Sequence, residues 1–395
     1  MRSHPPSRYL VRLLLAGLIV VAVVALLLQT MRMWNEMKFG SPGTDDFIEY
    51  WSAGQLLLQG KNPYDFAELH QIEVGLGAPY EFLNIMWNPP WLLVWILPLL
   101  LLPFKGAALA WWYLNTALFL SCGIAIWRLL APGKAWNRVR IEVALIATVA
   151  FIPGLLTIRM GQMSTLLLVG VVGFLYCVEK DKPFLAGMFL TLTTIKPLLY
   201  LLWIAVAWWV ITERQWKVVV GAGATLVVSL SALTAISPAW ITGYQRALQS
   251  PPLYWASATL AAVLHLSIFK NWPGAYFLPT AVGSVLLVGY LLTKRPRLNW
   301  RTALSPLLLA SVATAAHAWT FDQTVLLLPF LQIVSGMLSQ EPQMRPRRKR
   351  WIAGALLAIG AIMLIGNQLK IPNHLFFWTP WAWGIVYAYA QAAQR

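Results

Sequence analysis

The sequence predicts an all-α integral membrane protein, a polytopic helical bundle of about 12 spans. Hydrophobic residues make up 59% of its 395 residues and charged residues only 11%, whereas a soluble protein carries about 25% charged residues. Apolar stretches of about 15 to 22 residues recur along the chain, which is the length that bilayer thickness sets for a helical span. We therefore expect one integral-membrane domain over residues 1–395, with no separate soluble domain.

The segment at 10–30 is predicted to be the first span. Arg2, Arg8 and Arg12 accompany an apolar run that is long for a secretory signal peptide and lacks a convincing small-residue cleavage site. The positive-inside rule places these arginines in the cytoplasm. Residues 31–88 are then expected to form the first extracytoplasmic loop.

The segment at 89–103 is predicted to be short or re-entrant. It opens with two prolines after Asn88, and it is shorter than the roughly 20 residues that a span needs. If it crossed fully, the basic loop at 128–140 would lie outside the membrane, against the positive-inside rule.

Residues 184–211 are predicted to form two half-depth helices. They are too few for two full spans of roughly 20 residues each. Pro197 lies in their middle, where a proline removes a backbone donor and breaks a helix. Two helices that meet at Lys196 would line a cavity, the place where irregular backbone is tolerated at membrane depth.

The other predicted membrane segments are 107–128, 141–158, 164–178, 217–236, 275–292, 302–316, 321–338, 351–368 and 376–390. In this topology the basic loop at 339–350 is cytoplasmic, and polar residues at the span ends gather on the side of the first loop. That outer group contains Arg159, Gln162, Lys196, residues 237–272, His317 and residues 367–373. We expect a multi-pass protein of a bacterial plasma membrane whose active site faces outward.

The net charge of +16 does not predict a nucleic-acid partner. The Lys and Arg residues lie mainly in short loops between spans, as the positive-inside rule and contact with anionic membrane lipids require. Cys122 and Cys177 lie in apolar segments, so a disulfide framework, a zinc site and a thiol nucleophile are not expected. No cluster of metal ligands stands out, and no cofactor is expected.

Carboxylates concentrate in the first loop, where eight of the 14 Asp and Glu residues lie between Glu36 and Glu81. Residues 46–59 are predicted to form an amphipathic helix on the membrane surface. Asp46 with Glu49 three positions later is a capping-box pattern, so both capping and catalysis are open for Asp46. The two roles are compatible, because a general base must be held in place.

Several short motifs follow one another along the chain. They are Asp46-Phe47-Ile48-Glu49-Tyr50-Trp51, Asn62-Pro63-Tyr64-Asp65, Asn88-Pro89-Pro90, Gly161-Gln162, Lys196-Pro197 and His317-Ala318-Trp319-Thr320-Phe321-Asp322. In this order they resemble glycosyltransferase family 87, a family of the GT-C superfamily that includes polyprenyl-phosphate-mannose-dependent mannosyltransferases.

The resemblance implies a GT-C-type membrane enzyme that moves a hexose, mannose by analogy with the family, from a polyprenyl-phosphate sugar to a glycan or lipid acceptor with inversion. A first-loop Asp is the proposed base in GT-C enzymes. By its motif position that residue is Asp46 here, and Asp45 is the neighbouring alternative. Two adjacent carboxylates repel each other, which raises the pKa of one of them.

The departing polyprenyl phosphate needs cationic stabilisation, for which Arg159, Lys196 and His317 are the candidates. Lys196 is favoured because a lysine inside an apolar segment usually faces a cavity or a partner. Snorkelling to the interface is the alternative for Arg159, and a structural hydrogen bond is the alternative for His317. Supporting roles are expected for Asp322, Gln162, Tyr50, Trp51 and Tyr64.

A transporter or flippase of lipid-linked sugars is the alternative function. Such a protein is expected to have paired repeats and ionisable residues near the membrane midplane. The sequence has no visible repeat, and its polar residues gather toward one face. The enzyme is therefore the favoured prediction, whereas no motif specifies the sugar, the acceptor, a metal requirement or the oligomeric state.

Overall fold

The computed structural model describes residues 24, 28, 30–35, 38–81, 84–130, 138–269, 272–338 and 344–392. These residues form helices and no strand, which confirms the predicted all-α class. Among them, five helices are long and apolar enough to cross a membrane, or up to seven if each of two bent pairs is one span. The expected 12 spans are therefore not confirmed. Most of the first predicted span and part of the basic loop at 339–350 lie outside the described residues.

The five long apolar segments are α5 (Phe104–Leu130), α11 (Trp216–Ile236), α14 (Pro273–Lys294), η4 (Thr320–Leu326) with α16 (Leu327–Leu338), and α17 (Pro346–Gln368). Shorter helices complete the described bundle: α8 (Ser164–Glu179), α12 (Trp240–Gln249), α13 (Leu260–Val263), η3 (Leu264–Ile268), α15 (Trp300–Thr314), η5 (Asn373–Phe376) and α18 (Thr379–Gln391). Each predicted segment from 107–128 onward has helical counterparts in these elements or in the bent pairs described below.

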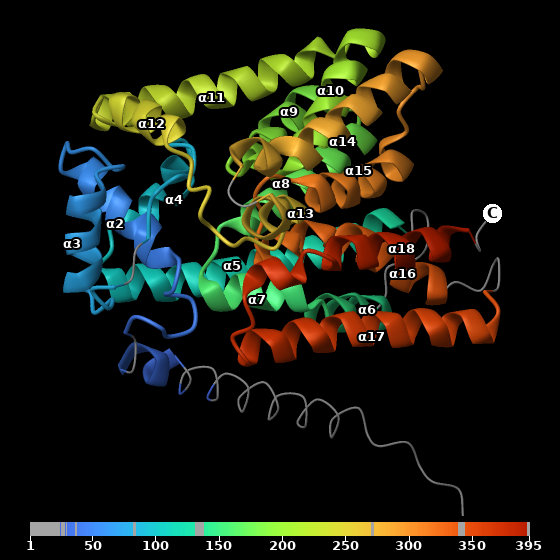
Figure 1. Cartoon of the computed structure of the whole chain (residues 1–395), viewed down its shortest axis with the longest axis horizontal. Coiled ribbons are helices and arrows are strands. Elements are labelled where there is room, and N and C mark those ends of the chain that lie inside the picture. The colour runs from blue at the N-terminus through green and yellow to red at the C-terminus, as the bar shows by residue number, and fades with distance from the viewer. Residues whose placement is uncertain are drawn as a thin grey trace, which may run out of the picture.

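The first loop contains α2 (Phe47–Leu58) and α3 (Phe66–Gly75), and α4 (Leu92–Leu100) follows it. Figure 1 shows these three helices together at one end of α5. The helix predicted at 46–59 is thus confirmed, but its surface position is wrong. Its buried side chains surround most of the helix, so α2 is enclosed by protein. With nine residues, about 13 Å at 1.5 Å per residue, α4 is too short to cross a bilayer, as predicted.

Two predicted segments are broken helices. The first runs through α9 (Pro183–Thr191) and η1 (Leu192–Thr194) into η2 (Pro197–Leu199) and α10 (Tyr200–Glu213), with a bend of 116° at Lys196, as predicted.

The second comprises α6 (Arg138–Val149) and α7 (Ile152–Met160), which meet at 67°. The prediction of one continuous helix over 141–158 is wrong here. Pro153 in the first turn of α7 has no N–H to bond the carbonyl of Val149, so the helix breaks before it.

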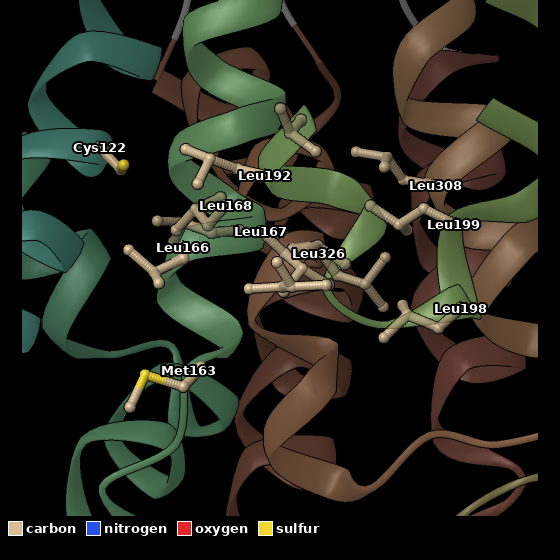
Figure 2. Close-up of a cluster of buried hydrophobic side chains, with 14 of the residues drawn as sticks. Cys122, Met163, Leu166, Leu167, Leu168, Leu192, Leu198, Leu199, Leu308 and Leu326 are labelled. Carbon is tan, nitrogen blue, oxygen red and sulfur yellow. The ribbon is translucent and has the colours of Figure 1, made fainter. Parts of the chain in front are cut away.

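The apolar core holds the broken segments against α8. Figure 2 shows Leu167 and Leu168 of α8 packed among side chains of the bent segment, α15 and η4, including Leu199, Leu308 and Leu326. These five leucines are almost fully buried. Interiors of this kind are close-packed and transmit displacement rather than absorb it. The start of α8, the bend at Lys196 and the segment before η4 are therefore fixed relative to one another.

Candidate active site

A cavity of about 290 Å³ lies where α2, the α7–α8 junction, the bend at Lys196 and the segment 317–322 meet. Six of the predicted site residues line it: Asp46, Tyr50, Gln162, Lys196, His317 and Asp322. A larger hollow of about 1010 Å³ between α15, α16 and α18 has Arg301 as its one charged lining residue among those described, and Arg301 pairs with Glu179. The smaller cavity is therefore the candidate site.

Gln162 connects the ionisable groups of the cavity. Its amide nitrogen donates to Oδ2 of Asp46 at 2.8 Å. Its amide oxygen accepts from Nζ of Lys196 at 2.7 Å and from the hydroxyl of Tyr50 at 3.0 Å. Because a carboxylate only accepts and an ammonium only donates, these partners define the orientation of the amide. A carboxylate and an ammonium group thus face the cavity on either side of one amide.

Lys196 makes a buried ion pair with Asp322, at 2.7 Å between Nζ and Oδ1. Its ammonium also donates to Oγ of Ser164 at 3.2 Å, and it lies 5.1 Å from the centre of the Phe321 ring. The other carboxylate oxygen of Asp322 accepts the backbone N–H of Trp319 at 2.8 Å. Asp322 therefore orients Lys196 while it is itself fixed to the backbone before η4.

Backbone contacts hold the first loop against the α7–α8 junction. The N–H of Gly43 donates to the carbonyl of Arg159 at 2.5 Å, and the N–H of Asp46 donates to the carbonyl of Met160 at 2.8 Å. Gly161, which follows Met160, has φ +73°, and a Cβ there would lie 2.4 Å from the carbonyl oxygen of Gly43. Only glycine fits this turn, and the close approach places Asp46 within reach of Gln162.

Side chains of α5 hold the same junction from the other side. The indole of Trp111 donates to the carbonyl of Gly161 at 2.8 Å, and the amide of Asn115 donates to the carbonyl of Gln162 at 3.0 Å. Asn88, from the third motif, donates to the carbonyl of Ile195 at 3.0 Å and so ties the first loop to the bend at Lys196. The site is thus positioned by hydrogen bonds between distant parts of the chain.

Asp46 occupies the N-cap position of α2, but its side chain caps no backbone N–H. The predicted capping role is therefore wrong, because the carboxylate turns toward Gln162 instead. Burial raises the pKa of Asp46 to about 7; the hydrogen bond from Gln162 and the charge of Lys196 lower it, and Asp45 raises it further. A carboxyl group with this pKa exchanges protons readily near neutral pH, as a general base must.

Asp45 and Arg159 do not line the cavity among the described residues. Burial raises the pKa of Asp45, and the positive charge of Arg159 lowers it. Arg159 is exposed and donates to the side-chain oxygen of Asn367 at 3.4 Å. Asp45 and Arg159 thus lie beside the contact between the first loop and the α7–α8 junction and not in the cavity lining.

His317 lines the cavity and is hydrogen-bonded through Nδ1 to the hydroxyl of Tyr276 at 2.9 Å. Burial lowers the pKa of His317 to about 4; Asp322 raises it and Lys196 lowers it. The ring is neutral at pH 7, so it can hydrogen-bond a phosphate but not neutralise it.

Trp51 and Tyr64 support the structure around the cavity without lining it. The indole of Trp51 donates to the carbonyl of Leu102 at 3.1 Å and its ring packs on Phe104. The hydroxyl of Tyr64 donates to the carbonyl of Asn88 at 2.7 Å.

Four polar residues that line the cavity were not predicted as site residues: Glu49, Asn84, Asn88 and Asn373. Glu49 was considered only as a capping partner, and Asn88 only as part of a motif. Ser164 does not line the cavity but donates to Asp322, and its position two residues after Gln162 could have indicated it. Within the described residues, no group of three or more His, Cys, Asp or Glu side chains could hold a metal ion.

Comparison with known proteins adds one match. The sequence model of glycosyltransferase family 87 matches residues 87–337. The matched region contains Gln162, Lys196, His317 and Asp322 but begins after Asp46. No curated protein and no solved structure matches the chain.

Proposed function

The chain belongs to glycosyltransferase family 87, and we propose that it transfers a hexose, mannose by analogy with the family, from a polyprenyl-phosphate sugar to a hydroxyl group of a lipid-linked or glycan acceptor. The reaction takes place at the outer face of the membrane. The observation that carries this proposal is the pairing of Asp46 and Lys196 across the single amide of Gln162. Membership in a glycosyltransferase family favours this enzyme over the alternative of a flippase.

Asp46 acts as the general base. No described residue donates to its Oδ1, so this oxygen is free to take the proton of an acceptor hydroxyl. The deprotonated oxygen attacks the anomeric carbon of the donor, and the bond from that carbon to the phosphate oxygen breaks with its electron pair on the phosphate. Attack opposite to the leaving group inverts the configuration. Holding base and donor in one cavity supplies the alignment that this displacement needs.

Lys196 stabilises the charge that develops on the departing phosphate. Its three donors are occupied by Gln162, Ser164 and Asp322. The bond to Ser164, at 3.2 Å, is the longest of the three and the one that a phosphate oxygen replaces most easily. Neutral His317, which also lines the cavity, adds a hydrogen bond to the phosphate.

The test is transfer by membranes that contain the protein, with radiolabelled polyprenyl-phosphate mannose and glucose as donors. The labelled product identifies the acceptor. Asp46→Asn should reduce transfer about 10²- to 10⁴-fold, the usual contribution of a general base. Asp45→Asn is the matched control and should remain active. Full activity of a well-inserted Asp46→Asn enzyme would refute the assignment, and loss of activity in Asp45→Asn alone would transfer it to Asp45.

A further inference from the structure

Two polar side chains of the cavity lack a partner among the described residues. The ionisable groups around Gln162 form a closed network in which each has at least one hydrogen bond. Glu49 lines the same cavity and makes no hydrogen bond to any described residue. The amide nitrogen of Asn84, also in the lining, is buried and has no partner in the part of the chain that the structure describes. Unpaired buried polar groups are rare in native proteins, so each needs an explanation.

Glu49 is placed to contact a molecule that is bound beside Asp46. It lies on α2 three positions after Asp46, the N-cap residue, and both residues line the cavity. Glu49 is buried, with only 6% of its surface exposed. Burial and the neighbouring carboxyl groups of Asp46 and Glu73 raise the pKa of Glu49 well above its usual range. A neutral carboxyl group both donates and accepts hydrogen bonds, and so does the hydroxyl group of a sugar.

The rest of the lining suits a sugar ring. Trp87, Trp255 and Trp319 line the cavity, and the rings of Trp255 and Trp319 lie 6.2 Å apart. Binding sites commonly combine aromatic walls with a few polar groups that fix the orientation of the ligand. A pyranose presents apolar C–H faces to such rings and hydroxyl groups at its edge. Glu49 and Asn84 are polar groups of the lining that can meet those hydroxyl groups.

We propose that Glu49, together with Asn84, binds a hydroxyl group of the pyranose that occupies the cavity, while Asp46 takes the proton of the reacting hydroxyl. This inference rests on the proposed function and adds a residue that recognises the sugar. The pyranose is either the sugar of the donor or the terminal sugar of the acceptor. Glu49 is accordingly a binding residue and not a second base.

The chain provides a matched control for this proposal. Glu73 on α3 is also a buried carboxyl residue, and its two side-chain oxygens have no hydrogen-bond partner among the described residues, but it does not line the cavity. Glu49→Leu should weaken sugar binding roughly tenfold, the effect of one lost hydrogen bond with its partner left unpaired. Glu49→Gln retains a donor and an acceptor and should stay within about twofold of the wild type. Glu73→Leu should leave sugar binding unchanged.

Two measurements on purified protein in detergent separate the sources of the sugar. The first compares binding of radiolabelled polyprenyl-phosphate mannose with binding of polyprenyl phosphate, which lacks the sugar. If Glu49 contacts the donor sugar, Glu49→Leu weakens only the first ligand. The second measurement is the KM for the acceptor in transfer assays. If Glu49 contacts the acceptor sugar, Glu49→Leu leaves the affinities for both polyprenyl ligands unchanged and raises the acceptor KM.

Two outcomes would overturn the proposal. One is a Glu49→Leu enzyme whose donor affinity and acceptor KM both equal those of the wild type. The other is a Glu49→Gln enzyme as inactive as Asp46→Asn, because the ionised carboxylate would then be required. Either outcome leaves the proposed transferase intact. A wild-type protein that binds polyprenyl-phosphate mannose no better than polyprenyl phosphate, and transfers nothing, refutes the proposed function and this inference with it.

Discussion

At the scale of single residues, the pKa of Asp46 is the balance of five influences. Burial raises it most, Gln162 and Lys196 stabilise the ionised form, and the negative charges of Asp45 and Asp322 destabilise that form. The result, about 7, is well above the usual value for an aspartate. Since each neighbour acts in a known direction, the ionisation of Asp46 can be shifted either way by substitution.

The rate of transfer should fall as the pH is lowered through about 7. Below that pH Asp46 carries a proton and cannot accept another, so kcat/KM should drop about tenfold per pH unit. A profile of kcat/KM against pH, measured with saturating acceptor, gives the apparent pKa. If the loss of activity at low pH (the acidic limb of the profile) occurs near pH 4, Asp46 is not the base or is not buried in the enzyme.

Two substitutions check the origin of that limb. Gln162→Leu removes a hydrogen bond to the ionised carboxylate, so the pKa of Asp46 should rise and the limb should move to higher pH. Asp45→Asn removes a neighbouring negative charge and should move the limb to lower pH. Limbs that coincide in all three enzymes would contradict this account.

The chemical character of Asp46 and Lys196 was predictable from sequence, because carboxylates are scarce elsewhere and a lysine in an apolar segment requires a partner. The connection of Asp46 and Lys196 through Gln162 was not predictable. Gln162 lies 116 positions from Asp46 and 34 from Lys196, and no local sequence pattern encodes a contact over such separations. Capping failed as a prediction for the same reason, because a distant amide replaced the backbone as the partner of Asp46.

At the scale of elements, the site depends on the docking of the first loop against the turn between α7 and α8. The turn is at Gly161, whose φ of +73° other residues rarely adopt. The hydrogen bonds of Gly43 and Asp46 to the carbonyls of Arg159 and Met160 join the two elements there. The position of Asp46 is therefore determined by this turn as much as by α2.

Gly161→Ala should separate the loop from the turn and reduce kcat at least tenfold, because a misplacement of about 1 Å costs up to about 10²-fold. The added methyl group would lie 2.4 Å from the carbonyl oxygen of Gly43. Gly60→Ala is the matched control, since Gly60 has φ +76° and no atom within 4 Å of its added Cβ. Both variants bear a backbone strain of about 1–2 kcal/mol, but only the first has a steric clash. Equal kcat and equal thermal stability in the two variants would contradict the docking role.

Breaks and burial of the helices were predictable to different extents. The bend at Lys196 was predicted because Pro197 lies in the middle of a segment that is too short for two spans. Pro153 gives the same signal near the α6–α7 break, but it lies within an apolar run of ordinary span length. The enclosure of α2 was missed because α2 packs against α3, α4 and α5, and sequence periodicity does not show contacts with such distant helices.

At the scale of the whole molecule, the acidic first loop and the basic connecting loops lie at opposite ends of α8, α10 and α15. α8 begins at Ser164 in the site and ends at Glu179, about 24 Å away at 1.5 Å per residue. There Glu179 pairs with Arg301 at the start of α15, whose other end leads to His317. Lys180 and Arg214 directly follow α8 and α10, which also lead away from the site. The carboxylates of the first loop thus lie at one end and the cations of the connecting loops at the other.

This charge separation predicts that the site faces outward, because cationic loops stay in the cytoplasm. Cys122 and Cys177 are both buried, so a membrane-impermeant maleimide should label the wild-type protein only weakly. Gln59→Cys introduces a thiol at an exposed position after α2, and Lys180→Cys introduces one at an exposed position after α8. In intact cells Gln59→Cys should react, whereas Lys180→Cys should react only after the membrane is permeabilised. The reverse pattern would place the cavity in the cytoplasm, and the donor would then have to present its sugar on that side.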